Sequence, residues 1–515
     1  MSRINSNIPS LVARSNLRKA NDDLQTRLER LSTGLRINRG ADDPAGLIVS
    51  NRIGSEISGL NQAVKNSERA SSVISTAEGA LNEAAELLNS IKGLVVEASN
   101  TGAISDEERA ANQLQIDSAI DSVTRISDSA SFGGLKLLNG SLDYVISGLR
   151  TSAITRAQVL NANMTNRTNL QVNVETIASA QTGRLYLRGD TLPSAGSPGF
   201  THLPSSVRVE VAGPRGVRTI EFISGARMSA IVAAVNNVKD ATGVSANIYG
   251  TTSGVVFNSM DFGSDEFVSV KPLGSAGGVT SFNTYKFPDA NPVVTPVVWA
   301  SMTAASRDAG RDVVALVNGS LGTGDGLRVR LPDSTNLGLD LTLNVDLATD
   351  PGDTSSFNIT GGGALYQLGG DINSSQQINI GLPSIAASRI GGTLIRQSNG
   401  TLKMQFLESV KSGGANDLRS GGFQNASDII IAAIDEISVI RGRLGALERN
   451  TLDTNVRSIQ AAIENLTSSQ STIRDADFAA ETAALTRAQI LNQASTSVVQ
   501  LANQQSQSVL ALLQR

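Results

Sequence analysis

The sequence predicts a multidomain α plus β protein in which the two ends of the chain form a long antiparallel helical coiled-coil bundle around a β-rich middle. Eleven of the 13 prolines lie between Pro193 and Pro383, and no aromatic residue precedes Phe132 or follows Phe478. The two ends are built from Leu, Ile, Val and Ala at helical spacing, whereas the middle carries prolines, aromatics and β-branched runs. At 515 residues the chain is also too long for one typical domain.

Composition narrows the classes of partner and chemistry. The net charge of -4 argues against partners held by bulk positive charge, namely nucleic acid and anionic membranes. The absence of cysteine excludes disulfides, thiol catalysis and cysteine-ligated metals. Charged residues make up only 17% of the chain, against an average near 25%. Such a surface indicates either burial in an assembly or a Ser/Thr/Asn-rich extracellular surface, and both interpretations remain open.

The first 36 residues predict a helix with a thin apolar seam. Leu17, Leu24 and Leu31 are seven residues apart, and Leu28 and Leu35 fill the alternate positions. Gly40 is the expected helix stop. Asp42, Asp43 and Pro44 then predict the start of the next helix, because Asp accepts the free amide hydrogens and proline suits the first turn.

The next segments predict a helical rod and its return. Residues 43–100 keep a 3.5-residue seam, and a helix of that length would be roughly 87 Å long. Ser105 and Glu108 form a capping-box pattern that starts a return helix through about Ser127. Residues 132–140 have glycines on both sides of an apolar run and predict a hairpin.

The middle of the chain changes period. Residues 151–161 read TSAITRAQVLN and resemble TAALTRAQILN at 482–492, and both segments are predicted as helices. The likeness indicates either equivalent packing environments or chance in a sequence of low complexity. From Asn169 onward, apolar and polar residues alternate as in strands. Strand-like runs and one short helix, at 228–238, predict a small α+β unit ending near Pro272. Residues 293–299 and 327–345 are further strand-like runs.

The end of the chain predicts helices again. Runs at 364–368 and 377–380 indicate a hairpin, and a long helix begins near Asn425. Residues 471–515 contain neither proline nor glycine, and their stripe includes Leu491, Val498, Leu501 and Leu512. Such a stripe needs a partner helix. Either the chain's own N-terminal helix buries it in a monomer, or neighbouring molecules bury it in an assembly.

An enzyme and a membrane-binding protein are both disfavoured. His202 is the sole histidine, so neither a two-histidine zinc motif nor a Ser-His-Asp triad with an alternative histidine exists. We therefore expect no catalytic, metal or cofactor-binding residues. The N-terminus lacks the apolar core of a secretory signal peptide, and no run of about 18 apolar residues predicts a membrane span. The terminal helices also lack the basic face and aromatic anchors of interfacial helices.

Three stretches resemble bacterial flagellin. LERLSTGLRINRGADDPAGL, from Leu28 to Leu47, is similar to its N-terminal signature, and FGGLKLLNG, from Phe132 to Gly140, to the hairpin of its N-terminal half. IRDADFAAETAALTRAQILNQASTSVVQLANQQSQSVLALLQR, from Ile473 to Arg515, resembles its C-terminal end. The likeness covers roughly the first 165 and last 155 residues. Residues 207–273 resemble an insertion module found in many flagellins, less specifically.

This resemblance implies a structural subunit that polymerises into the extracellular flagellar filament used for swimming. Residues 1–42 plus 471–515 would form the coiled coil of the inner core, and 43–180 plus 361–470 the helical rod of the outer core. Residues 181–360 would form one or two variable surface domains, with any boundary near 275–290. The implied partners are other copies of the chain, an export chaperone, the filament cap and hook-associated proteins, with neither nucleic acid nor membrane. The implied self-assembly residues lie on the two terminal seams: Leu24, Leu28, Leu31, Leu35, Leu491, Val498, Leu501 and Leu512.

The resemblance also sets out an alternative and two departures. A hook–filament junction protein shares the N-terminal signature and would assemble in a few copies. Many flagellins carry Pro-Gln where this chain has Ser506 and Gln507, so we expect a straighter terminal helix. In the region recognised by a Toll-like receptor, Ser90 and Gln115 replace the family's Arg and Glu, whereas Leu94 matches. We therefore expect weak recognition by that receptor.

Overall fold

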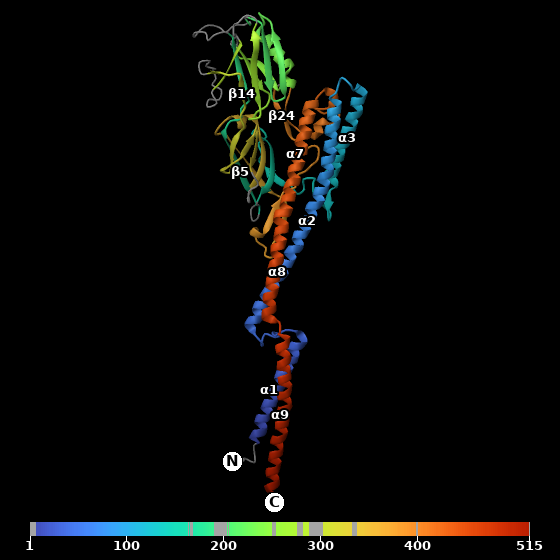
Figure 1. The fold of residues 1–515 in the computed structure, drawn as a ribbon, viewed down its shortest axis with the longest axis vertical. Helices are drawn as coiled ribbons and strands as arrows, with labels where there is room; N and C mark the ends of the chain where they lie inside the picture. Colours follow the sequence, from blue (N-terminus) through green and yellow to red (C-terminus); the bar gives the residue numbers. More distant parts are fainter. Residues whose placement is uncertain are drawn as a thin grey trace. The chain divides into compact units, whose positions relative to one another are not determined.

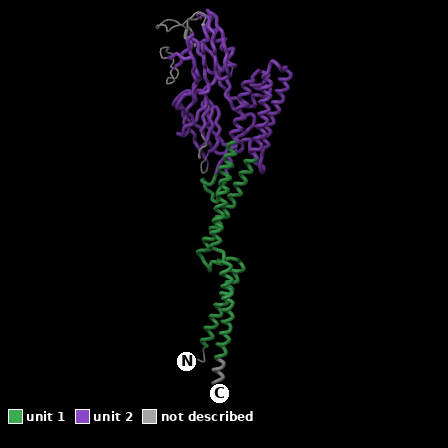
Figure 2. The backbone as a smooth tube through the Cα atoms, in the orientation of Figure 1, with its two compact units in different colours: residues 1–75, 366–377, 442–515 green, residues 76–365, 378–441 purple. Residues whose placement is uncertain are grey.

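The computed structural model describes residues 7–162, 164, 168–189, 203, 205–249, 254–275, 282–287, 302–331, 337–397 and 400–513. The chain divides into two compact units, which Figure 2 colours separately. Unit 1 contains residues 1–75, 366–377 and 442–515, and unit 2 contains residues 76–365 and 378–441.

Unit 1 is helical, and its first helix ends earlier than expected. Helix α1 spans Ile8–Thr33, and Gly34 closes it with a left-handed φ of 71° while donating its N–H to the Arg30 carbonyl. The prediction that this helix stops at Gly40 was therefore wrong, because Gly34 already supplies the left-handed cap. Helix α2 spans Pro44–Ala98, as predicted. The Asp43 carboxylate accepts the Gly46 N–H at 2.9 Å, which confirms the predicted cap.

The C-terminal segment is two helices rather than one. Helix α8 spans Asp453–Arg474, and α9 begins at Phe478 and ends at Leu513. In the break, the Arg36 N–H donates to the Arg474 carbonyl at 2.7 Å and the Ala476 N–H donates to the Gly34 carbonyl at 2.9 Å. The predicted uninterrupted helix from Ser471 is therefore wrong, since this backbone pairing with the segment after α1 replaces a helical turn.

The long return helix begins as predicted. Helix α7 spans Phe423–Leu447, and a π-helical turn over Glu448–Leu452 leads into α8. Gly442 and Gly445 lie inside α7 without ending it. The predicted hairpin before this helix is also present, as the pair of strands β21 (Ala364–Gln367) and β22 (Gln377–Ile380).

Unit 2 contains the helix predicted from Ser105 to about Ser127 and the first hairpin. Helix α3 spans Asp106–Ser129, and both hydrogen bonds of the predicted Ser105–Glu108 capping box are present. Strands β1 (Ser131–Phe132) and β2 (Leu135–Lys136) form the predicted hairpin. Further short elements follow later in the chain: strands β23 (Thr393–Arg396) and β24 (Leu402–Gln405), and 3-10 turns η2 (Ser374–Gln376, in unit 1), η3 (Leu407–Val410) and η4 (Leu418–Ser420).

Two β-sheets and the short helix α6 (Val345–Thr349) enclose the first β core of unit 2. The strand orders are β16-β15-β5-β20-β3 and β17-β18-β19-β4. Their inward residues form one apolar cluster that includes Val172, Val329 and Phe357. The strands are β3 (Tyr144–Ser147), β4 (Ile154–Ala162), β5 (Leu170–Ala178), β15 (Val314–Val317), β16 (Ser320–Leu321), β17 (Thr323–Asp325), β18 (Arg328–Leu331), β19 (Leu337–Leu343) and β20 (Thr354–Gly362).

The helix predicted for residues 151–161 is wrong. Residues 154–162 form strand β4, which pairs along its length with β19. Ile154 and Val159 of β4 are buried in the first β core. Tertiary pairing has overridden the local likeness to a helical segment, as it commonly does for short segments.

The second β core lies, in sequence, inside the first. Its strand orders are β13-β12-β6-β10-β9 and β14-β11-β7-β8, and Ile231 and Val235 of helix α4 (Met228–Asn237) join its apolar cluster. The predicted strands and helix between residues 207 and 257 are present. The strands are β6 (Arg184–Gly189), β7 (Val207–Gly213), β8 (Gly216–Phe222), β9 (Val244–Tyr249), β10 (Gly254–Ser259), β11 (Phe267–Ser275), β12 (Phe282–Lys286), β13 (Thr303–Ala304) and β14 (Arg307–Ala309), and a short helix α5 (Lys239–Thr242) follows α4. The predicted strand at 293–299, like His202, lies outside the described residues.

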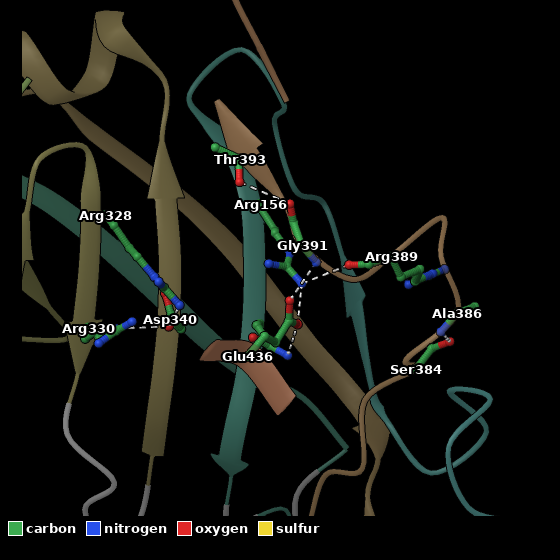
Figure 3. Close-up of polar contacts among 11 residues, drawn as sticks. Arg156, Arg328, Arg330, Asp340, Ser384, Ala386, Arg389, Gly391, Thr393 and Glu436 are labelled. Atoms are coloured by element: carbon green, nitrogen blue, oxygen red, sulfur yellow. Dashed lines mark hydrogen bonds and ion pairs between the residues drawn. The ribbon is translucent and has the colours of Figure 1, made fainter. Parts of the chain in front are cut away.

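A buried ion pair joins the first β core to helix α7 within unit 2. Figure 3 shows Arg156 of β4 pointing toward Glu436 of α7, with a nitrogen–oxygen distance of 2.6 Å. The Glu436 side chain is only 8% exposed. Its carboxylate also accepts hydrogen bonds from the Gln158 side chain at 3.1 Å and the Gly391 N–H at 3.2 Å. Three donors from strand and loop therefore converge on one helical carboxylate, and the Arg156 guanidinium also donates to the Arg389 carbonyl at 3.0 Å.

Candidate self-assembly surface

The terminal helices α1 and α9 lie side by side and run antiparallel in unit 1 (Figure 1). Near the start of α1, the Asn7 side chain donates to the Ala502 carbonyl at 3.2 Å. Near its end, Arg27 lies 3.2 Å from Glu481. The residue numbers of the two helices therefore run in opposite directions along the pair.

Small and polar side chains form most of the seam between these helices. The facing residues repeat at alternating spacings of three and four, the spacing of a coiled coil. On α1 they are Ser10, Ala13, Leu17, Ala20, Leu24, Arg27 and Leu31, all buried or partly buried. On α9 they are Glu481, Leu485, Ala488, Asn492, Ser495, Val499 and Ala502, also buried or partly buried. Only five of these fourteen residues are large and apolar, so the pair gains less from the hydrophobic effect than a coiled coil with a large apolar residue at every seam position.

Polar contacts fix the register of the seam. The Glu481 side chain is 10% exposed and receives Arg27, which also bonds Asp23 one turn earlier on α1. Desolvation lowers the pKa of Arg27, but the hydrogen bonds and charges of Glu481 and Asp23 outweigh it and raise that pKa. At the other end the Ser10 hydroxyl donates to the Asn503 side chain at 2.8 Å.

Large apolar side chains on the same two helices remain exposed to water. Apart from Phe478, the first residue of α9, which is 66% exposed, their exposed fractions run from 49% for Leu28 to 61% for Ile490. The set is Ile8, Leu11, Val12, Leu28, Ile490, Leu491, Val498 and Leu501, and we call it the terminal apolar surface. Because exposed apolar patches can mark sites of protein–protein contact, the terminal apolar surface is a candidate for such a contact.

The structure divides the eight predicted seam residues into two groups. Leu24 and Leu31 lie in the intrachain seam, and Leu35 is partly buried where it pairs with Asp475. Leu28, Leu491, Val498 and Leu501 belong to the terminal apolar surface. The interpretation of the α9 stripe as intrachain core is therefore wrong, because the residues that face α1 are on the neighbouring stripe through Ala488 and Ala502. The side chain of Leu512 lies outside the described residues.

Sequence reasoning missed two features of the terminal helices. Val12 and Ile490 were not assigned to any stripe, although both are more than half exposed. The intrachain stripe of α9 was also missed, because a search for Leu, Ile and Val passes over Ala and Ser. The seven-residue repeat through Glu481, Ala488, Ser495 and Ala502 is the signal that would have found it.

The three residues aligned with the receptor region lie on helices of unit 2. Ser90 and Leu94 are one turn apart on α2, and Gln115 is on α3. Ser90 and Gln115 are exposed, and Leu94 is partly buried. Neutral side chains thus occupy the two exposed positions.

Two other kinds of site were sought in the described part of the chain. None of its helices has the length and hydropathy needed to cross a bilayer. Among the same residues, no group of three or more His, Asp or Glu side chains is placed to hold a metal ion.

Three family models match the chain. The N-terminal helical region of bacterial flagellin matches residues 4–143, the C-terminal helical region matches 427–513, and the flagellin hook IN motif matches 209–261. The last lies within the second β core.

Curated relatives match over the full length. B-type flagellin of Pseudomonas aeruginosa is 30% identical over 515 residues, covering 99% of each chain. Flagellin of Salmonella typhimurium is 30% identical over 543 residues, again covering 99% of each. A crystal structure of flagellar hook associated protein-3 from Legionella pneumophila is similar at a TM-score of 0.31 and 11% identity, covering 82% of this chain and 98% of that one.

The family models cover both helical ends, and the relatives extend the match through the middle. Flagellins are structural proteins of the extracellular flagellar filament rather than enzymes. The chain belongs to the bacterial flagellin family.

Proposed function

We propose that the chain polymerises into the extracellular flagellar filament used for swimming, and that the terminal apolar surface is the contact between subunits. The observation that supports this proposal is that different faces of α1 and α9 carry different residue types. Small and polar side chains make up most of the seam between the two helices, which also contains five large apolar side chains, whereas eight further large apolar side chains stay exposed. A monomer gains nothing from this arrangement, but neighbouring subunits that cover the surface do.

The free energy gained by burying the terminal apolar surface is sufficient to drive assembly of many copies. Full burial of a Leu, Ile or Val side chain is worth about 1.5–3 kcal/mol. Since each of the eight is already about half buried, its remaining gain is on the order of 1 kcal/mol. The sum per subunit offsets the loss of translational and rotational freedom only when many copies associate at once. Such a dependence favours a long polymer with many contacts over a dimer.

The assignment of segments to filament layers is part of this proposal. Residues 1–42 and 471–515 form the inner core, the rod helices of 43–180 and 361–470 form the outer core, and residues within 181–360 form the surface. The chain leaves the cell through the flagellar export apparatus without a cleaved signal peptide, with an export chaperone as its partner. The filament cap and hook-associated proteins contact it at the two filament ends.

A seeded polymerisation assay tests the role of the terminal apolar surface. The double variant Leu491→Gln/Val498→Gln removes two exposed apolar side chains, and glutamine keeps the helix because its helix propensity is high. Electron microscopy should show long filaments from the unaltered chain and almost none from the double variant. Ile223→Gln is the matched control, because Ile223 is 73% exposed on a strand connection away from the terminal helices. Filaments of normal length from the double variant would refute the proposal.

A second arm tests the terminal helix as a whole. A chain ending at Asp475 lacks α9 but keeps α8, which ends at Arg474. We expect this shortened chain to remain monomeric in the seeded assay. Filament growth from it would show that subunit contacts lie elsewhere.

The hook–filament junction protein is the alternative within the same family of assemblies. The two functions differ in the number of copies and in their position. Antibody labelling of sheared flagella should mark the entire filament if the chain is the filament subunit. Labelling confined to the base would assign the chain to the junction instead.

We also propose that the Toll-like receptor for flagellin recognises this chain weakly. Ser90 and Gln115 are exposed and uncharged, so the ionic contacts expected from an Arg and a Glu are missing. In a receptor reporter assay, the double variant Ser90→Arg/Gln115→Glu should activate more strongly than the unaltered chain. Strong activation by the unaltered chain would refute this proposal.

A further inference from the structure

A cavity of about 700 Å³ lies where the chain passes between the two β cores of unit 2. The first core contributes Ala180 and Thr349 to its lining, and the second contributes Tyr186 and Asp308. Small-molecule sites typically measure roughly 300–1,000 Å³ and occur preferentially between structural modules. The cavity has the size and position of such a site, and polymerisation through the terminal helices makes no use of it.

The floor of the cavity is rigid. Two chain crossings form it, and they exchange backbone hydrogen bonds: Gln181 N–H to the Arg311 carbonyl at 2.8 Å, and Arg311 N–H to the Gln181 carbonyl at 2.9 Å. A Cβ at Gly310 would lie only 2.4 Å from the Gly263 carbonyl oxygen. Only glycine permits this approach of the backbones, so the site is formed before any ligand arrives.

Basic side chains outnumber acidic ones in the lining. Arg184, Lys286 and Arg311 face Asp308 and Asp350. Asp308 already accepts the Arg184 N–H at 2.8 Å and lies 3.5 Å from the Lys286 ammonium. Asp350 is exposed at the end of α6. The lining therefore suits an anionic ligand, and a planar guanidinium binds a carboxylate through two parallel hydrogen bonds.

The remaining lining suits a sugar ring. Phe287 contacts Tyr186 edge to face, with ring centroids 5.3 Å apart and planes at 84°. This contact fixes the orientation of Phe287, which is partly exposed, so its ring offers an apolar face to the C–H groups of a ligand. Gln181, Ser179 and Thr349 also line the cavity. The Gln181 amide donates to the Ser179 hydroxyl at 3.2 Å and the Thr349 hydroxyl donates to the Val345 carbonyl at 2.8 Å, and the amide and both hydroxyl oxygens keep further hydrogen-bonding capacity for ligand hydroxyls.

We propose that this cavity binds an acidic saccharide, that is, a sugar bearing a carboxylate. Arg184 and Arg311 bind the carboxylate, and the Phe287 ring packs against the sugar. This property goes beyond the proposed role as a filament subunit, since a chain that polymerises without the cavity would still form filaments. In an assembled filament the same site would be repeated in every subunit, so a polymeric ligand would bind more tightly than a short one.

Calorimetry on the full-length monomer tests the proposal with three probes. Digalacturonate should bind, whereas the neutral disaccharide cellobiose should bind at least about tenfold more weakly, because a charge-assisted pair is lost. Inorganic phosphate should not compete. Equal binding of both sugars, binding of phosphate as tight as that of digalacturonate, or binding of no probe would each overturn the proposal.

Variants locate the site. Arg311→Gln keeps both backbone hydrogen bonds of the crossing and should weaken digalacturonate binding about tenfold or more. Arg218→Gln is the matched control, because Arg218 is exposed on β8 and does not line the cavity. If Arg311→Gln lowers the melting temperature, Phe287→Leu replaces it, with the same loss expected. Unchanged affinity in a folded variant of this kind would refute the assignment.

Discussion

Removing Arg156 should destabilise unit 2 more than neutralising its partner Glu436. The Arg156 guanidinium lies 2.6 Å from the Glu436 carboxylate, and the two side chains are 21% and 8% exposed. In Arg156→Met the carboxylate keeps only the hydrogen bonds from Gln158 and the Gly391 N–H. A buried carboxylate without its cation costs about 3–5 kcal/mol.

The opposite change should cost less. In Glu436→Gln the amide oxygen still accepts a hydrogen bond, and Arg156 is more exposed, so water solvates part of its charge. We expect a loss of about 1–3 kcal/mol. The double variant Arg156→Met/Glu436→Gln removes both charges but keeps a side-chain oxygen that accepts from Gln158 and the Gly391 N–H, so it should be less destabilised than Arg156→Met alone. The two single effects are therefore strongly non-additive.

Amide hydrogen exchange is the suitable assay, because a chain with several cores does not unfold in one step. The Gly391 N–H reports directly, since it donates to Glu436. Its protection should fall by about two orders of magnitude or more in Arg156→Met and return in part in the double variant. The α3 amides after the Ser105 cap serve as an internal control and should change little.

Two outcomes would refute this reasoning. Additive losses in the double variant would mean that Arg156 and Glu436 contribute independently. Equal losses in the two single variants would mean that the lower exposure of Glu436 has no energetic consequence.

Three further predictions concern other parts of the chain. Burial, aided by the charge of Asp261 and opposed by that of Arg215, raises the pKa of Glu266 from 4.5 to about 7. Because the folded state then binds more protons than the unfolded state, unit 2 should lose stability as pH rises from about 4.5 to 7. Melting curves of Glu266→Gln should lack that loss, and an unchanged dependence of melting temperature on pH would contradict the prediction. Ser105→Ala removes the hydroxyl of the α3 capping box and should cost about 1 kcal/mol, measured as faster exchange in the first turn of α3 but not in its last turn. Ala488→Leu adds volume to a position that is 1% exposed in the α1–α9 seam and should cost about 1–3 kcal/mol, seen as lost protection of α1 amides; retained protection would mean that the seam is loosely packed.

Local signals in the sequence predicted most of the elements. The capping box at Ser105, the Asp43 cap of α2 and the hairpin at residues 131–136 depend on neighbours a few residues apart, so a short stretch contains the whole cause. The alternation between residues 207 and 257 similarly predicted strands of the second β core.

The interleaving of the two β cores could not be predicted in the same way. The first core joins residues 144–180 to residues 313–359, and the second core occupies much of the sequence between them. Each strand looks alike in sequence whichever sheet it enters, because the alternation records burial of one face and not the identity of the partner. The residues that mark the crossing, such as Gly310, show their purpose only when the opposing backbone is in place.

One heptapeptide shows how far the partner decides both structure and function. Residues 155–161 read TRAQVLN and lie in β4, whereas residues 486–492 read TRAQILN and lie in α9. In the strand, the period of two directs Arg156 and Gln158 to the same carboxylate on α7 while Val159 is buried at 2% exposure. In the helix, the period of 3.6 directs Ala488 and Asn492 toward α1, and Ile490, the counterpart of Val159, is 61% exposed. The same apolar position is thus buried within the chain in β4 and exposed in α9. An apolar stripe alone, which both segments have, therefore does not indicate an assembly surface. We propose that the indication is an apolar stripe that stays exposed while a neighbouring stripe of the same helix, here the one through Ala488, packs against the chain's own partner helix.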